Sequence, residues 1–157
     1  MSTHTTVAAV EKSITVTCSV EHAFKVFTDG IGDWWPLHAK SISVQDDGTG
    51  APETVILEAG VGGRLYERTA DGEELEWGQV LAWEPPHRVV LEWRPSRTPT
   101  TPTEVEVRFT TEGASTRVDL EHRGWERLEP KRASESRGNY DRGWVSVMQT
   151  FADAASG

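Results

Sequence analysis

Six short runs of alternating apolar and polar residues follow one another between Pro52 and Arg123, and one long amphipathic segment closes the chain. Glycine- and proline-containing turns separate the runs, and alternation of this kind is typical of strands with one buried face. The short connections favour an antiparallel meander. The six runs are TVILEA, RLYERT, ELEWGQVLAW, RVVLEW, TEVEVRFT and STRVDLEHR.

The closing segment, from about Ser134, carries its apolar side chains at helical spacing, which predicts a long helix with one apolar stripe. That stripe must be buried against another apolar surface, and the apolar face of the predicted sheet is the only large apolar surface in the predicted fold. We therefore expect a curved sheet wrapped around a C-terminal helix. The stripe consists of Tyr140, Trp144, Val147, Met148 and Phe151.

A further strand and two short helical pieces are predicted before the meander. Residues 11–18 alternate as a strand does, and Ser19 is a good N-cap for a short amphipathic helix that ends at Asp29-Gly30. The next segment predicts one helical turn ending at Trp35, because Pro36 interrupts it.

The length and net charge of the chain limit the classes of function that it can have. A chain of 157 residues makes one domain, which we assign to residues 11–155 after a flexible tail, 1–10. A net charge of −9 argues against nucleic acid and against an anionic membrane as partners. No apolar run is long enough to span a membrane, and residues 1–9 are rich in threonine and lack the basic-then-apolar pattern of a signal peptide. The single cysteine, Cys18, fits a reducing compartment, so we expect a cytoplasmic protein.

Several segments carry a family likeness. The tract WGQVLAWEPPHRVVLEW is the most specific of them, and VEKSITVTCSVEHAFKVFT, DWWPLHAKS, VGGRLYER, STRVDLEHRGWE and YDRGWVSVMQTFADA accompany it in the same order. With these segments the chain resembles the START/SRPBCC helix-grip superfamily, in the branch named for homology to the activator of the heat-shock chaperone ATPase. The resemblance implies an α+β helix-grip fold, with about seven strands around the helix and an internal cavity able to hold a small apolar molecule.

The chain has seven tryptophans, an excess for its length, and an indole offers a large apolar face with one polar N–H. Each ring taken alone is more simply explained as core. Together, rigid rings on a curved sheet leave the kind of gap that an apolar ligand fills. Our candidates for the lining are Trp35, Trp77, Trp93 and Trp144, with Met148 as an adaptable wall residue.

Strand side chains alternate between the two faces of a sheet, so the run RLYER has two possible registers. Each of them places a charged side chain on the apolar face. Tyr66 inward would carry Arg64 and Arg68 with it, whereas Leu65 inward would carry Glu67. The resemblance favours Leu65 inward. Glu67 would then fix a ligand hydroxyl or amine or act as an acid or base; the alternative is a rim carboxylate bonded to a neighbouring Arg or tryptophan N–H.

His122 lies on the inward face of its strand with Val118 and Leu120. A lone histidine in such a place is more often a core residue with satisfied hydrogen bonds than a catalyst. If Glu67 lies within hydrogen-bond reach, the two could polarise a ligand or transfer a proton, and they are the only catalytic candidates.

The sequence has no motif for metal binding or for phosphate binding. The five histidines are scattered, so we expect neither a metal nor another cofactor, and the glycines at 60–63 fit a hairpin turn better than a phosphate loop.

The sequence thus predicts a binding protein for a small apolar ligand, lipid-like or aromatic, oriented by Glu67 and His122. One alternative is a cyclase- or hydratase-type enzyme that uses the same cavity. Another is a protein-interaction module, such as a chaperone regulator, that uses the outer face and DWWPLHAK. A homodimer through a sheet edge or the tryptophan-rich segment is a further alternative.

Overall fold

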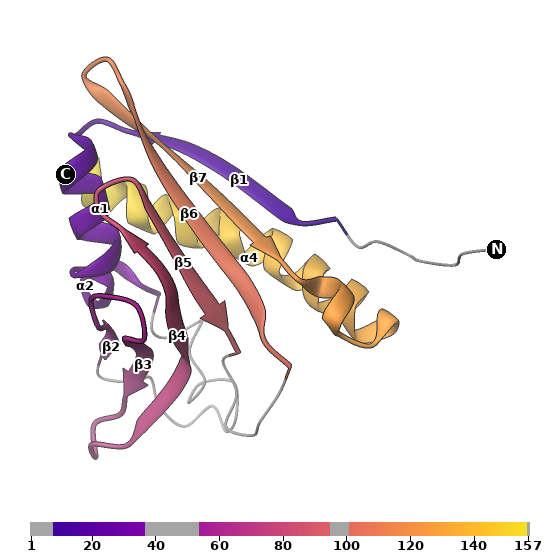
Figure 1. Ribbon diagram of the computed structural model, residues 1–157. Helices are drawn as coiled ribbons and strands as arrows, with labels where there is room; N and C mark the ends of the chain where they lie inside the picture. Colours follow the sequence, from indigo (N-terminus) through magenta and orange to yellow (C-terminus); the bar gives the residue numbers. More distant parts are fainter. Residues whose placement is uncertain (1–7, 37–53, 95–100, 157) are drawn as a thin grey trace.

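One antiparallel sheet dominates the molecule. The computed structural model describes residues 8–36, 54–94 and 101–156, and within these residues seven strands lie in the order β1-β7-β6-β5-β4-β3-β2. The sheet curves around the long helix α4, while α1 and α2 lie at the end of the sheet where α4 finishes (Figure 1). This is the α+β helix-grip fold expected from the sequence.

The predicted strands are confirmed, most of them to within a residue or two at each end. The elements are β1 (Val10–Val16), α1 (Val20–Thr28), α2 (Ile31–Trp34), β2 (Thr54–Leu57), β3 (Arg64–Arg68), β4 (Glu74–Glu84), β5 (Arg88–Trp93), β6 (Thr103–Glu112), β7 (Ser115–Arg123), the 3-10 helix η1 (Trp125–Arg127) and α4 (Pro130–Ser156).

The two short helices begin and end at the predicted signals. The Ser19 hydroxyl accepts a hydrogen bond from the backbone N–H of His22 and so caps the first turn of α1. The single turn α2 has Trp34 as its last residue and Trp35 as its C-cap, whose ψ of 133° is no longer helical. Trp34 and Trp35 are both buried, so these two residues of DWWPLHAK present no ring to a partner, and residues 37–40 of that segment lie outside the described residues.

Helix α4 begins four residues earlier than the predicted start at Ser134. Pro130 is its first residue, a position that suits proline because the first N–H of a helix has no intrahelical partner. The first turn carries no apolar stripe apart from Ala133, so periodicity alone could not locate it.

Strands β3 and β4 carry an irregularity that affects the interior. Their register shifts between Leu65 and Tyr66. Leu65 and Glu67 both face inward, as predicted, and Tyr66 is buried too, under the guanidinium of Arg64. On β4, Gly78 has room for no side chain, because a Cβ there would lie 1.8 Å from the backbone oxygen of Glu92.

The outer face of the sheet is charged, and its acids and bases pair across strands. Glu106 belongs to this polar face, as the alternation along its strand indicates, yet it is buried, with 7% of its surface exposed. Arg88 and Arg123 cover it, with N···O distances of 2.7 and 2.5 Å. Burial alone would raise the pKa of Glu106, but the hydrogen bonds from both guanidinium groups outweigh it and lower that pKa to about 2.

At the N-terminus, β1 begins at Val10, so the last residue assigned to the tail is a strand residue, while residues 1–7 lie outside the described part. The guanidinium of Arg137 on α4 donates hydrogen bonds to the carbonyls of Ala8 and Ala9. Among the helices of the described residues, none is both long and apolar enough to cross a bilayer.

Candidate functional site

Four tryptophans from four different elements meet between the sheet and α4. The Trp77 ring centroid lies 5.0 Å from that of Trp35 and 5.7 Å from that of Trp93. The Trp144 ring centroid lies 5.3 Å from that of Trp93 and 6.1 Å from that of Trp35. All four side chains are buried, at separations typical of attractive aromatic contacts. We call these four residues the tryptophan cluster; they are the four rings selected from the sequence.

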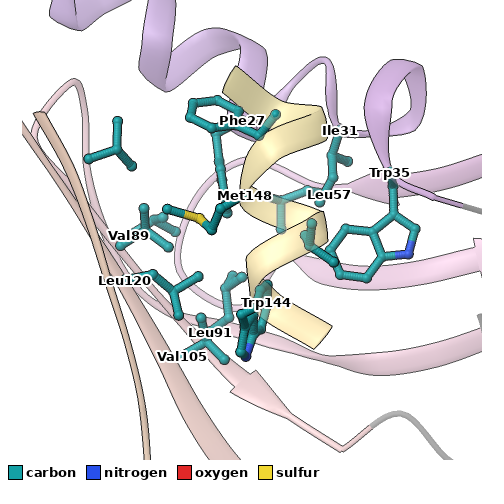
Figure 2. Packing of buried hydrophobic residues seen from close by; sticks show 14 of the residues in the cluster. Phe27, Ile31, Trp35, Leu57, Val89, Leu91, Val105, Leu120, Trp144 and Met148 are labelled. Carbon is teal, nitrogen blue, oxygen red and sulfur yellow. The ribbon is translucent and has the colours of Figure 1, made fainter. Parts of the chain in front are cut away.

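Met148 extends the same apolar surface along α4. It lies one helical turn after Trp144 and is 4% exposed. In Figure 2 its thioether points toward Val89 and Leu120 of the sheet, while Trp144 lies beside Leu91 and Val105. The helix side of the interior is therefore formed by one aromatic and one flexible side chain in succession.

Glu67 is the only acidic side chain that is fully buried, 0% exposed, within the described residues. The indole N–H of Trp77 donates a 2.8 Å hydrogen bond to its Oε1 atom. Alternation left two registers open for this strand, and the register favoured by the family resemblance, with Glu67 on the inner face, is the correct one. The tryptophan N–H partner was also anticipated, but as a contact at the sheet rim rather than in the interior.

His122 is fully buried on β7, and its ring centroid lies 6.1 Å from that of Trp93. Its Nδ1 atom lies 3.0 Å from the indole nitrogen of Trp144, and its Nε2 atom lies 2.7 Å from the hydroxyl oxygen of Thr103. An indole N–H can only donate, so Nδ1 is the acceptor and Nε2 carries the proton of the neutral ring. The Thr103 hydroxyl oxygen accepts a hydrogen bond from the Nε2–H group, and the same hydroxyl donates a 3.2 Å hydrogen bond to the backbone oxygen of Trp93.

Burial makes His122 a poor base. Desolvation by burial lowers the pKa of His122 to about 3, so its ring is neutral at physiological pH. Both ring nitrogens already have partners, Trp144 and Thr103. Glu67 and His122 are thus bonded to different tryptophans of the cluster rather than to each other.

Two residues near the cluster were not predicted as site residues. Thr103 completes the hydrogen bonds of His122, and Tyr140 accepts a 3.1 Å hydrogen bond from the indole N–H of Trp93. Tyr140 was placed in the apolar stripe of the helix, one turn before Trp144, and that spacing was the available signal. Thr103 had no such signal, because it becomes important only through the pairing of β5 with β6.

Within the residues that the structure describes, no three His, Cys, Asp or Glu side chains lie close enough together to bind a metal ion. Cys18 is half-buried, and that burial raises the pKa of its thiol, which disfavours the reactive thiolate.

The outer face holds a shallow pocket of about 250 Å³ over β1 and β7. Its charged side chains are largely neutralised by neighbours, since Lys12 pairs with Asp141 and Arg117 pairs with Asp119. The pocket thus offers a ligand little net charge, and the interior is the better candidate site.

Comparisons with known proteins agree with this fold. The family described as Activator of Hsp90 ATPase homolog 1-like protein matches residues 17–155. The self-sacrificing resistance protein CalC from Micromonospora echinospora is 30% identical, with 94% of each chain covered and a TM-score of 0.66. The anthrahydroquino-gamma-pyrone synthase Txn09, solved in complex with SUM, is 38% identical over 74% of this chain and 77% of its own, with a TM-score of 0.52.

The Aha1 dimer from Colwellia psychrerythraea shares the fold at 17% identity, with a TM-score of 0.66 over 96% of this chain and 97% of its own. No curated protein matches the chain. Because the family match covers most of the sequence and CalC is similar over nearly the whole length, the chain belongs to the Activator of Hsp90 ATPase homolog 1-like family of the helix-grip superfamily.

Proposed function

We propose that this protein binds a small, flat aromatic or lipid-like molecule between the sheet and α4. The tryptophan cluster supplies the apolar faces. Glu67 supplies a polar group that orients the ligand, and His122 orients the cluster through its hydrogen bond with Trp144. The proposed contact residues are Trp35, Glu67, Trp77, Trp93, His122, Trp144 and Met148.

The observation that carries this proposal is the fully buried Glu67 beside the tryptophan cluster. Burial of a carboxylate opposes folding unless hydrogen bonds compensate, and an apolar residue of similar size packs an interior at lower cost. A carboxylate kept among tryptophan rings therefore points to a use other than packing. Accepting a hydrogen bond from a ligand hydroxyl or amine is such a use.

The relatives favour an aromatic ligand over a lipid. The synthase at 38% identity takes its name from an anthrahydroquino-gamma-pyrone, which is a flat, oxygen-bearing aromatic skeleton. A skeleton of this shape matches a site made of indole faces, because offset stacking adds to the burial of apolar area. A ligand would replace some of the ring contacts within the cluster, while the hydrogen bonds of Trp77 and Trp144 hold the edges of their rings.

Two experiments test the proposal. Native mass spectrometry of the protein purified from its own source should reveal a retained small molecule. Titration with anthraquinone-2-sulfonate should quench tryptophan fluorescence with saturation. Trp77→Phe should weaken that binding by about tenfold, which corresponds to about 1.4 kcal/mol.

Trp83→Phe is the matched control, since Trp83 lies on the same strand but packs against Phe24 outside the cluster. Equal affinities for the wild type and both variants, or no binding of any aromatic or lipid probe, would contradict the proposal.

A catalytic role is the second candidate, favoured by the similarity to a synthase. Glu67 would be its acid or base, because His122 is neutral with both nitrogens engaged. In that case Glu67→Gln would keep affinity for a ligand recovered from the source but would stop its conversion, as followed by mass spectrometry. Conversion at an unchanged rate would remove Glu67 from this role.

Two further expectations belong with this proposal, a cytoplasmic location and a homodimer. The lone, half-buried Cys18 is compatible with the first. Light scattering on the purified protein decides the second, because a dimer doubles the 17.4 kDa mass of the chain. A chaperone partner is less well supported, since Trp34 and Trp35 face the interior.

A further inference from the structure

Tyr140 places a hydroxyl group at the edge of the tryptophan cluster. It lies on α4, one helical turn before Trp144, and its ring centroid is 4.6 Å from that of His122. Its hydroxyl oxygen lies 3.1 Å from the indole nitrogen of Trp93. The hydroxyl group is therefore held next to the proposed ligand site by a member of the cluster itself.

The hydrogen bonds of Tyr140 leave one donor unused. The indole N–H of Trp93 can only donate, so the phenol oxygen accepts in that contact and its own proton points elsewhere. No acceptor for this proton occurs among residues 8–36, 54–94 and 101–156. Burial raises the pKa of Tyr140, and the hydrogen bond from Trp93 offsets this only in part, so the hydroxyl keeps its proton at neutral pH.

His122 and Thr103, the other two hydrogen-bonding side chains described beside Trp93, have no comparable donor to offer. The Nε2 proton of His122 is donated to Thr103, and the Thr103 hydroxyl proton is donated to the backbone of Trp93. Glu67 offers a carboxylate, which accepts hydrogen bonds when ionised. A ligand held against the cluster thus meets an acceptor at Glu67 and a donor at Tyr140.

We infer that Tyr140 donates a hydrogen bond to a carbonyl oxygen of the bound aromatic molecule and thereby selects quinone-like ligands over plain aromatic hydrocarbons. This inference rests on the proposed function. It adds a specificity-determining residue and narrows the ligand class to flat aromatic systems with a carbonyl acceptor on the ring edge. A partly buried donor discriminates in this way because a ligand without an acceptor leaves it unpaired.

The test compares two probes of the same shape and charge, anthraquinone-2-sulfonate and anthracene-2-sulfonate. Only the first has carbonyl acceptors on the central ring. Wild-type protein should bind the quinone more tightly, and Tyr140→Phe should weaken quinone binding by about three- to tenfold while leaving anthracene binding unchanged. Tyr66→Phe is the matched control, since the other tyrosine of the chain lies under Arg64 on the outer side of β3.

A second measurement does not depend on the variant's folding. The infrared carbonyl band of the quinone should shift to lower wavenumber on binding to wild-type protein, as it does when a carbonyl accepts a hydrogen bond. Unchanged quinone affinity in a folded Tyr140→Phe protein, or an unshifted carbonyl band, overturns the role of Tyr140 while the binding function stands. If wild-type protein binds neither probe, the proposed function fails for aromatic ligands and the inference falls with it.

Discussion

The indole N–H of Trp144 donates a hydrogen bond to Nδ1 of His122 across the interface between α4 and β7. Because the donor cannot also accept, this contact selects the His122 tautomer with its proton on Nε2. That proton is in turn directed to Thr103. Helix α4 and the sheet are therefore joined by a buried hydrogen bond, and this bond forms only while His122 is neutral.

The first prediction concerns acid stability. The folded-state pKa of His122 is about 3, below its ordinary value of 6.5, so between these values the unfolded chain binds a proton that the folded protein does not. The free energy of unfolding should hence be largest above pH 6.5 and fall as the pH drops toward 3. The loss between pH 7.5 and pH 5 should be about 2 kcal/mol, measured by urea unfolding.

His122→Gln should be less stable at pH 7.5 but should lose most of that dependence between pH 7.5 and pH 5. His22→Gln is the control, since His22 is exposed on α1, and it should retain the wild-type dependence. An equally steep decline in the His122→Gln protein would show that burial of His122 is not its cause.

The second prediction concerns Glu67 and Trp77. Their 2.8 Å hydrogen bond joins a buried acceptor to a buried donor, and leaving one partner of such a bond unsatisfied costs about 1–3 kcal/mol. Trp77→Phe removes the donor and retains an aromatic ring, and Glu67→Gln replaces the carboxyl group with an amide of similar shape. In a double-mutant cycle the two substitutions should be coupled by about 1–2 kcal/mol in the free energy of unfolding.

Coupling near zero would mean that the hydrogen bond contributes little in the folded protein. The cycle of Glu67→Gln with Trp83→Phe provides the comparison, because Trp83 packs against Phe24 and should show no coupling.

Local signals in the sequence were sufficient to predict most of the fold. The Ser19 cap, the alternation along each run and the helical spacing of Trp144, Met148 and Phe151 all depend on neighbouring residues. The early start of α4 at Pro130 was not predictable in this way, since its first turn packs by Ala133 alone.

The site could be predicted only in part, because its polar contacts depend on pairing between distant strands. Alternation placed His122 on the inner face, and the family resemblance chose the register that does the same for Glu67. Neither could show that the two residues are bonded to different tryptophans. Glu106 on the outer face is a second example. Alternation along β6 places its side chain on the polar face, but its burial depends on Arg88 and Arg123 from the two adjacent strands.

The third prediction concerns Glu106. Its folded-state pKa of about 2 lies below the ordinary value of 4.5, so its contribution to stability is present above pH 4.5 and is lost as the pH falls toward 2. Glu106→Gln removes the partner that Arg88 and Arg123 share, and it should lower the free energy of unfolding at pH 7 by about 2 kcal/mol. Urea unfolding at pH 7 and pH 3 measures both effects.

Glu112→Gln serves as the control, because Glu112 is exposed at the end of β6 and should change stability by less than about 0.5 kcal/mol. If Glu106→Gln were as mild, the cross-strand ion pairs would be shown to add little to the fold.

The last prediction concerns the apolar contact between α4 and the short helices. Phe151 is fully buried, with its ring centroid 5.3 Å from those of both Phe27 and Trp34. Phe151→Ala removes these contacts and leaves a cavity, which should lower the free energy of unfolding by about 3–5 kcal/mol in a thermal or urea denaturation experiment. Val145→Ala on the same helix should change it by less than about 0.5 kcal/mol, since Val145 is 60% exposed. Similar effects of the two substitutions would contradict the packing of α4 against α1 and α2, whereas a large difference would show that the contacts of Phe151 with Phe27 and Trp34 stabilise the fold.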